Sequence, residues 1–153
     1  MAISGILNMA LAPRPMVDKA PDFVLKDVDG NEVSSSMFQN KILLLNFWAT
    51  WCPPCQAEIP HLASLYKEYQ SKGLEVVGIS LDEEGSEVVK TFVERKGIPY
   101  KILIGNDGIA NSFGGIRGIP TTFLIGRDGR IIRRYLGEQE KRVFEQDIKK
   151  LIS

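Results

Sequence analysis

The fold is decided by residues 42–55, which read Ile42-Leu43-Leu44-Leu45-Asn46-Phe47-Trp48-Ala49-Thr50-Trp51-Cys52-Pro53-Pro54-Cys55. The first half of this stretch is an almost continuous apolar run, which is typical of a strand buried on both faces of a sheet. Two prolines follow Cys52 directly, and proline favours the first position of a helix because it loses no hydrogen bond there. The stretch therefore predicts a central strand that runs into a helix at Pro53, with two cysteines at the junction.

The rest of the chain alternates between strand and helix patterns. Turn residues at Asp27-Val28-Asp29-Gly30-Asn31 separate two short strands and predict an N-terminal hairpin. The helix that starts at Pro53 reaches Lys72-Gly73, a basic last turn followed by a C-terminal glycine. Further strands are expected at 23–26, 32–34, 74–81 and 100–104 and around Arg127-Asp128-Gly129, further helices at 86–96 and 138–152, and one helical turn at 109–113. We expect an α/β fold, with a central mixed β-sheet flanked by helices on both faces and an N-terminal β-hairpin extension.

Composition and charge limit the classes of partner. The chain has 153 residues, 44% of them hydrophobic, which is the size and composition of one globular domain with a full core. Its 19 basic and 19 acidic residues cancel, so no net charge favours a nucleic acid or an anionic membrane. No apolar run approaches the roughly 18 to 20 residues of a membrane helix. We expect residues 19–153 to form one domain with no nucleic-acid partner and no membrane span.

The first 18 residues allow two interpretations. Residues 2–12 are mostly apolar and end in Ala10-Leu11-Ala12, which is similar to the cleavage site of an export signal. No Lys or Arg precedes them, however, and Pro13 follows directly. Residues 1–18 are therefore either a truncated or degenerate export segment or a loosely packed N-terminal extension.

Cys52 and Cys55 are the only cysteines, which excludes a multi-bridge disulfide scaffold and a four-cysteine zinc site. The single histidine, His61, has no second imidazole to assist it, so we expect no metal site. A thiolate on Cys52 would lie at the positive end of the helix dipole, which lowers thiol pKa values to roughly 3.5–7.5. We expect Cys52 to be the attacking thiol. Cys55, one turn later and expected to be more buried, would resolve the mixed disulfide that Cys52 forms with a substrate.

Several motifs together resemble the thioredoxin superfamily. They are Phe47-Trp48-Ala49-Thr50-Trp51-Cys52-Pro53-Pro54-Cys55, Pro60 and Gly118-Ile119-Pro120-Thr121-Thr122-Phe123. Ala20-Pro21-Asp22-Phe23 and Glu58 narrow the resemblance to the TlpA, ResA and DsbE type, over residues 19–153. The resemblance implies a thiol–disulfide oxidoreductase that reduces disulfides in protein substrates and receives electrons from a thiol electron donor protein. We expect it to need no cofactor.

The resemblance also implies a place of action. Members of this type are usually exported or membrane-anchored and keep cysteine pairs reduced in an oxidising compartment, often during cytochrome c maturation. The chain has no CxxCH haem-attachment motif of its own. We expect a monomer in the periplasm or another extracytoplasmic compartment, with the cytoplasm as the alternative.

Three further residues are expected beside the cysteines, and for two of them the resemblance is the reason. It implies a cis peptide bond between Ile119 and Pro120, although only about 5–6% of X–Pro bonds in folded proteins are cis. The Ile119 backbone would then face the sulfurs and offer its N–H and C=O to an extended substrate segment. Trp51, next to Cys52, is expected to border the same substrate surface, whereas Trp48 is expected in the core.

Glu58 is the candidate residue for proton transfer. Where the resemblance places a buried aspartate in the central strand of thioredoxin, this chain has Asn46, and Gly78 stands in place of a nearby lysine. Asparagine cannot take up a proton, and Glu58 is the carboxylate nearest to the cysteines in sequence. In related reductases a glutamate at this place belongs to the active site. The alternative is a solvated glutamate on a helix surface.

Three other functions are open at this level. Peroxiredoxins share the fold and a similar start, but their Pro-x-x-x-Thr-x-x-Cys motif requires proline at Leu45 and threonine at Ala49. A redox-inert thioredoxin-like binding module commonly loses one cysteine, and both are present here. A CxxC pair also suits a copper chaperone, because thiolates are preferred ligands of Cu(I).

Overall fold

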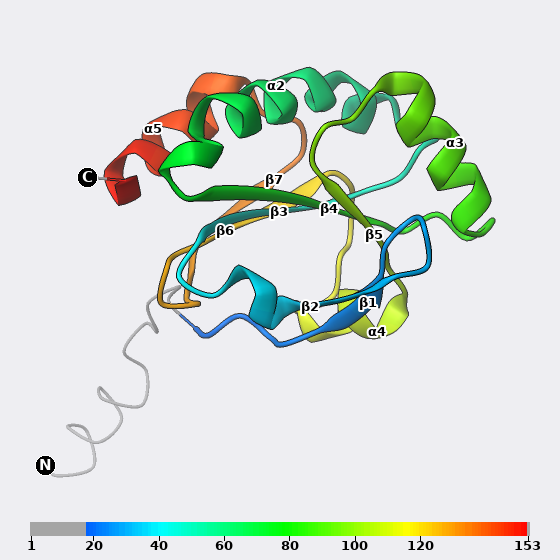
Figure 1. Ribbon diagram of the computed structural model, residues 1–153, viewed down its shortest axis with the longest axis horizontal. Coiled ribbons are helices and arrows are strands. Elements are labelled where there is room, and N and C mark those ends of the chain that lie inside the picture. Colours follow the sequence, from blue (N-terminus) through cyan, green and yellow to red (C-terminus); the bar gives the residue numbers. More distant parts are fainter. Residues whose placement is uncertain (1–17, 153) are drawn as a thin grey trace, which may run out of the picture.

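The strand at the centre of the molecule is β3 (Ile42–Trp48), as the apolar run predicts. In the computed structural model, which describes residues 18–152, five strands form one sheet in the order β5-β4-β3-β6-β7 (Figure 1). The strands beside β3 are β4 (Leu74–Ser80), β5 (Lys101–Ile104), β6 (Thr121–Ile125) and β7 (Ile131–Leu136). Because β3 is parallel to β4 and antiparallel to β6, the sheet is mixed, as predicted.

Helices cover both faces of this sheet, as Figure 1 shows. On one face lie α2 (Pro53–Tyr69), α3 (Ser86–Lys96) and α5 (Lys141–Ile152). The other face carries α4 (Asp107–Ser112) and a separate antiparallel pair, β1 (Val24–Lys26) and β2 (Glu32–Ser34). This pair is the predicted N-terminal hairpin. Short 3-10 turns follow β2 at Ser35–Phe38 and α2 at Gln70–Lys72.

The sheet separates two hydrophobic cores. Successive side chains of a strand point to opposite faces, so Leu44 belongs to one core and Leu45 to the other. The core under the long helices includes Trp48, Leu62, Phe92, Phe144 and Ile148. The core under the hairpin and α4 includes Phe23, Val33, Phe47, Phe113 and Phe123. Burial on both faces explains why β3 has no alternation of polar and apolar residues.

The helix ends follow the glycine signals, but one helix face differs from expectation. Gly73 and Gly97 both adopt left-handed backbone conformations, with φ of 98° and 65°, after the last turns of their helices. The apolar spacing in α3 predicts that Val88, Val89, Phe92 and Val93 lie on its buried face. That prediction is wrong for Val88, which is 38% exposed, because the buried stripe begins one residue later.

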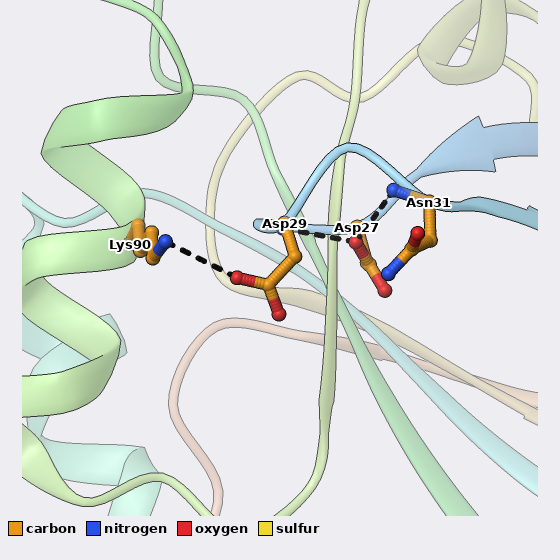
Figure 2. A network of polar contacts seen from close by, with 4 residues as sticks. All are labelled: Asp27, Asp29, Asn31 and Lys90. Atoms are coloured by element: carbon orange, nitrogen blue, oxygen red, sulfur yellow. Dashed lines mark hydrogen bonds and ion pairs between the residues drawn. The ribbon is translucent and has the colours of Figure 1, made fainter.

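The turn of the N-terminal hairpin is organised by Asp27 (Figure 2). Its Oδ1 atom accepts the N–H groups of Asp29 and Asn31 at 2.9 and 3.0 Å. Lys90 of α3 forms an ion pair with Asp29 at 3.3 Å. Lys101 of β5 approaches Asp27 Oδ2 at 3.9 Å. The two lysines therefore connect the turn of the hairpin to α3 and β5 of the main domain.

Residues 1–17, on which both interpretations of the N-terminal segment depend, lie outside the described residues. None of the helices between residues 18 and 152 combines the length and apolar character that a membrane crossing requires. Over the same range, no group of three or more His, Cys, Asp or Glu side chains is placed to hold a metal ion.

Candidate active site

Cys52 and Cys55 lie where the central strand passes into the first long helix. Cys52 is the N-cap residue of α2, which begins at Pro53 as predicted. The two sulfurs form a disulfide, and the two Cα atoms are 5.2 Å apart. The N–H of Cys55 points at Cys52 Sγ across 3.3 Å, so this sulfur occupies the place of a capping oxygen. The positive end of α2 is therefore directed at Cys52 Sγ.

Burial does not separate the two cysteines. Cys52 is 3% exposed and Cys55 is 2% exposed, whereas the sequence predicts a more buried Cys55. Both side chains belong to the core cluster under the long helices, which explains their equal burial. The tryptophans differ as predicted: Trp48 is 2% exposed and packs against Phe92, and Trp51 is 63% exposed beside the disulfide.

The Ile119–Pro120 bond comes to the cysteines from far along the sequence. It is a cis peptide bond, as predicted, and the Ile119 carbonyl oxygen lies 3.7 Å from Cys52 Sγ. The carbonyl of Pro120 accepts the N–H of Gly137 at 2.8 Å, and Thr121 Oγ1 donates to the Gly118 carbonyl at 2.6 Å. These bonds attach the segment to the residue that follows β7 and hold the start of β6 next to the disulfide.

Glu58 is fully buried, which excludes a solvated helix glutamate. Its Oε1 atom accepts Nδ2 of Asn46 at 2.9 Å, and its Oε2 atom accepts the main-chain N–H of Gln139 at 2.9 Å. The same Asn46 Nδ2 donates to Thr122 Oγ1, also at 2.9 Å. Residues from α2, β3, β6 and the segment before α5 therefore hold one carboxyl group in place, one helical turn after Cys55.

The surroundings of Glu58 change its acidity. Burial raises the pKa of its carboxyl group from 4.5 to about 7, because the charged form loses its hydration. The hydrogen bonds from Gln139 and Asn46 lower the pKa, and the nearby negative charge of Glu138 raises it further. Burial dominates, so Glu58 exists in both the protonated and the ionised form near neutral pH. Such a group can both accept and release a proton during a reaction.

The sequence does not identify all partners of Glu58. Gln139 acts through its main-chain N–H, and a main-chain group gives no signal in the residue type. Thr122 belongs to the recognised motif around Pro120, but its hydroxyl contact with Asn46 depends on the antiparallel pairing of β3 and β6. That register places Asn46 directly opposite Thr122.

The site brings together the chemical groups that disulfide exchange requires. The cysteine pair can exist as a dithiol or as a disulfide, and the start of α2 favours a thiolate on Cys52. A carboxyl group with a pKa of about 7 lies one turn behind Cys55. The carbonyl of the half-buried Ile119 lies against Cys52 Sγ, and the exposed Trp51 immediately precedes Cys52.

Comparison with known proteins agrees with this geometry. Residues 16–134 match the family model described as the AhpC/TSA family. A thiol-disulfide oxidoreductase ResA from Bacillus thuringiensis subsp. konkukian is 37% identical over 133 residues, which cover 87% of this chain and 76% of the relative. A ResA of Bacillus anthracis is 35% identical over 159 aligned residues, covering 99% of this chain and 91% of the relative.

Solved structures show the same architecture. A thiol:disulfide interchange protein of the thioredoxin family from Chlorobium tepidum superposes with a TM-score of 0.81 at 34% identity, covering 92% of this chain and 99% of that one. A secreted thiol-disulfide isomerase from Corynebacterium glutamicum also reaches 0.81, at 26% identity, with coverages of 87% and 84%. The names of the relatives favour an oxidoreductase over a peroxiredoxin or a redox-inert module. The chain thus belongs to the AhpC/TSA family and, among its thioredoxin-like members, to the thiol–disulfide oxidoreductases of the ResA type.

Proposed function

We propose that this oxidoreductase reduces disulfides in protein substrates, with Cys52 as the nucleophile and Cys55 as the resolving thiol. The observation that carries the proposal is the position of Cys52 Sγ. It caps α2, faces the N–H of Cys55 and lies 3.7 Å from the Ile119 carbonyl oxygen. One atom is therefore placed both for thiolate stabilisation and for contact with a bound chain.

The reaction proceeds by two exchanges. The Cys52 thiolate attacks one sulfur of the substrate disulfide, and the other substrate sulfur leaves as a thiolate that is then protonated. Cys55, once deprotonated, attacks Cys52 Sγ and releases the second substrate thiol. Two electrons and two protons have then passed to the substrate, and the enzyme holds the Cys52–Cys55 disulfide seen here. A thiol electron donor protein restores the dithiol by the reverse sequence.

Glu58 serves as the proton acceptor and donor for Cys55 in this proposal. It follows Cys55 by three residues on α2, and its pKa of about 7 suits transfer in both directions at neutral pH. Asn46 and Gln139 each donate a hydrogen bond to the carboxyl group and hold its orientation. Neither the Asn46 amide nor the Gln139 main-chain N–H can accept the proton of the Glu58 carboxyl group at neutral pH.

Trp51, Ile119 and Pro120 form the proposed substrate-binding surface. The main chain of Ile119 pairs with an extended substrate segment, which suits many sequences because backbone hydrogen bonds do not depend on side chains. Trp51 adds an exposed aromatic surface on the loop before Cys52. No cofactor takes part in this mechanism.

We place the reaction in the periplasm or another extracytoplasmic compartment and assign it to cytochrome c maturation. The secreted relative from Corynebacterium glutamicum supports the compartment, and the resemblance to the ResA type supports the pathway. Deleting the gene should reduce covalently bound haem in the host, and a Cys52→Ser gene should not restore it. Unchanged haem attachment would contradict the pathway while leaving the reaction intact. We further propose that the enzyme acts as a monomer, which light scattering of the purified chain tests.

The deciding experiment for the direction of the reaction is the reduction potential of the Cys52–Cys55 pair against glutathione. Thioredoxin-fold proteins range from roughly −270 mV for reductants to roughly −120 mV for oxidants. We expect a value near the thioredoxin end. A value near −120 mV would show that the enzyme oxidises its substrates instead.

A further inference from the structure

The loop between β3 and α2 is held by a buried carboxylate that the proposed reaction does not use. Asp82 follows the end of β4 and is 8% exposed. Its two oxygens accept the N–H of Thr50 at 3.0 and 3.2 Å, and Oδ2 accepts the Thr50 hydroxyl at 2.5 Å. Oδ1 accepts the hydroxyl of Ser80 at 2.6 Å. Each carboxylate oxygen therefore has two donors.

Thr50 is also held from its other side. Its carbonyl accepts Nε2 of Gln56, in the first turn of α2, at 2.6 Å. Both main-chain polar groups of Thr50 are thus bound by side chains, one from the end of β4 and one from α2. The N–H of Leu81 donates to the Trp48 carbonyl at 2.8 Å, so the loop is attached to the end of β4 at two points. Cys52 comes two residues after Thr50, and its N–H donates to the Ala49 carbonyl at 3.3 Å.

Asp82 is bound by neutral donors alone among the described residues, since none of their ion pairs includes it. A buried carboxylate without a cation is costly unless hydrogen bonds replace its hydration. Its negative charge, near the nucleophile, would by itself disfavour a thiolate. If Asp82 assists Cys52, its hydrogen bonds to Thr50 must therefore lower the thiol pKa of Cys52 by more than its negative charge raises it.

We propose that Asp82 is a positioning residue for Cys52: by fixing Thr50, it holds Cys52 Sγ in line with the N–H of Cys55 at the start of α2. This inference rests on the proposed role of Cys52 as the nucleophile. The inference predicts the direction in which the thiol pKa of Cys52 changes when Asp82 is removed. Removing a mere nearby negative charge lowers the thiol pKa of Cys52, whereas releasing the loop moves the sulfur away from the helix start and raises it.

The test measures the pH dependence of Cys52 alkylation by iodoacetamide in a Cys55→Ser background, where one thiol reacts. In that background Asp82→Ala should raise the thiol pKa by about half a unit to one unit and slow alkylation at pH 6 by roughly threefold to tenfold. Thr50→Val, which keeps the side-chain shape but removes one hydroxyl donor, should shift the pKa in the same direction by less. The matched control is Glu83→Ala, which removes an exposed charge from the residue next to Asp82. This variant should leave the thiol pKa of Cys52 unchanged.

A fall in the thiol pKa of Asp82→Ala, or no change, would overturn the inference. If Asp82→Ala does not fold, as judged by circular dichroism, the sign of the Thr50→Val shift decides in the same way. The proposed function is tested separately by the parent chain. If its Cys52 has an ordinary thiol pKa and the chain reduces no disulfide, the proposed function fails; if the parent is active and only the variants disagree, the positioning role fails alone.

Discussion

Replacing Glu58 by glutamine should change how the stability of the protein depends on pH. The carboxyl group is fully buried between Asn46 and Gln139, and burial raises its pKa to about 7 from the ordinary 4.5. Between these two pH values the unfolded chain releases the proton and the native protein keeps it. The free energy of unfolding therefore falls as the pH rises from about 4.5 to about 7, and it is constant on either side as far as Glu58 is concerned.

The magnitude follows from the difference between the two pKa values. Integrating the proton difference from pH 5 to pH 8 gives a loss of about 2 to 3 kcal/mol in the wild type. Glutamine does not titrate, so the Glu58→Gln variant should lack this loss. The wild type should accordingly lose about 2 to 3 kcal/mol relative to the variant over this range, whatever the offset between the two proteins at pH 5.

Urea unfolding of both oxidised proteins at pH 5, 6, 7 and 8 measures this difference, and the closed disulfide keeps the cysteines from titrating. Glu84→Gln is the matched control, because Glu84 is exposed and an exposed carboxylate has similar surroundings in both states. A difference between wild type and Glu58→Gln that stays constant to within about 0.5 kcal/mol would refute the reasoning. It would mean that Glu58 ionises as readily in the native protein as in the unfolded chain.

The catalytic assignments lead to further expectations. Cys55→Ser should trap mixed disulfides with protein substrates on non-reducing gels and Cys52→Ser should not; the opposite pattern would exchange their roles. Glu58→Gln should slow thiol–disulfide exchange and remove a rate dependence on pH near 7, and stopped-flow rates that match the wild type at every pH would exclude a role in proton transfer. Trp51→Ala should raise KM for a protein substrate several-fold and change the unfolding free energy by less than about 1 kcal/mol, since the side chain is exposed; an unchanged KM would remove Trp51 from the substrate surface.

The sequence predicts the centre of the fold well because local and global signals agree there. The apolar side chains of Ile42–Trp48 are removed from water only when both faces of the strand are buried. Pro53 fits the first turn of a helix, where it loses no hydrogen bond. Gly73 and Gly97 mark helix ends through a backbone conformation that other residues adopt at a cost. At these positions the residue type nearly determines the structure.

Features with weaker sequence signals are predicted less accurately. The last helix is predicted from residue 138 but begins at Lys141, and in the segment before it the Gln139 N–H donates to Glu58. The equal burial of Cys52 and Cys55 was also not predicted. Their spacing gives the disulfide, but exposure depends on the packing of neighbouring elements, which the local sequence does not contain.

The least predictable parts of the site are contacts between residues far apart in the chain. The Asp82 carboxylate meets Thr50 only because β3 and β4 are parallel neighbours, so that their carboxyl ends share one edge of the sheet. The sequence shows an acidic loop there and gives no sign of which of its carboxylates is buried. The same applies to Thr122, whose hydroxyl meets Asn46 through the register of β3 and β6.

The position of Glu58 can be understood from the two residues that differ from thioredoxin. Asn46 and Gly78 are direct partners in the pairing of β3 with β4, so the sheet behind the cysteines carries neither an acid nor a base at these positions. A side chain added at Gly78 would meet Trp48 and Ile102 at 3.0 Å or less, because these two side chains occupy the space beside Gly78. The carboxyl group comes instead from α2, and Asn46 has become its hydrogen-bond donor. Asparagine suits this role because its amide donates a hydrogen bond to the carboxyl group without exchanging a proton with it.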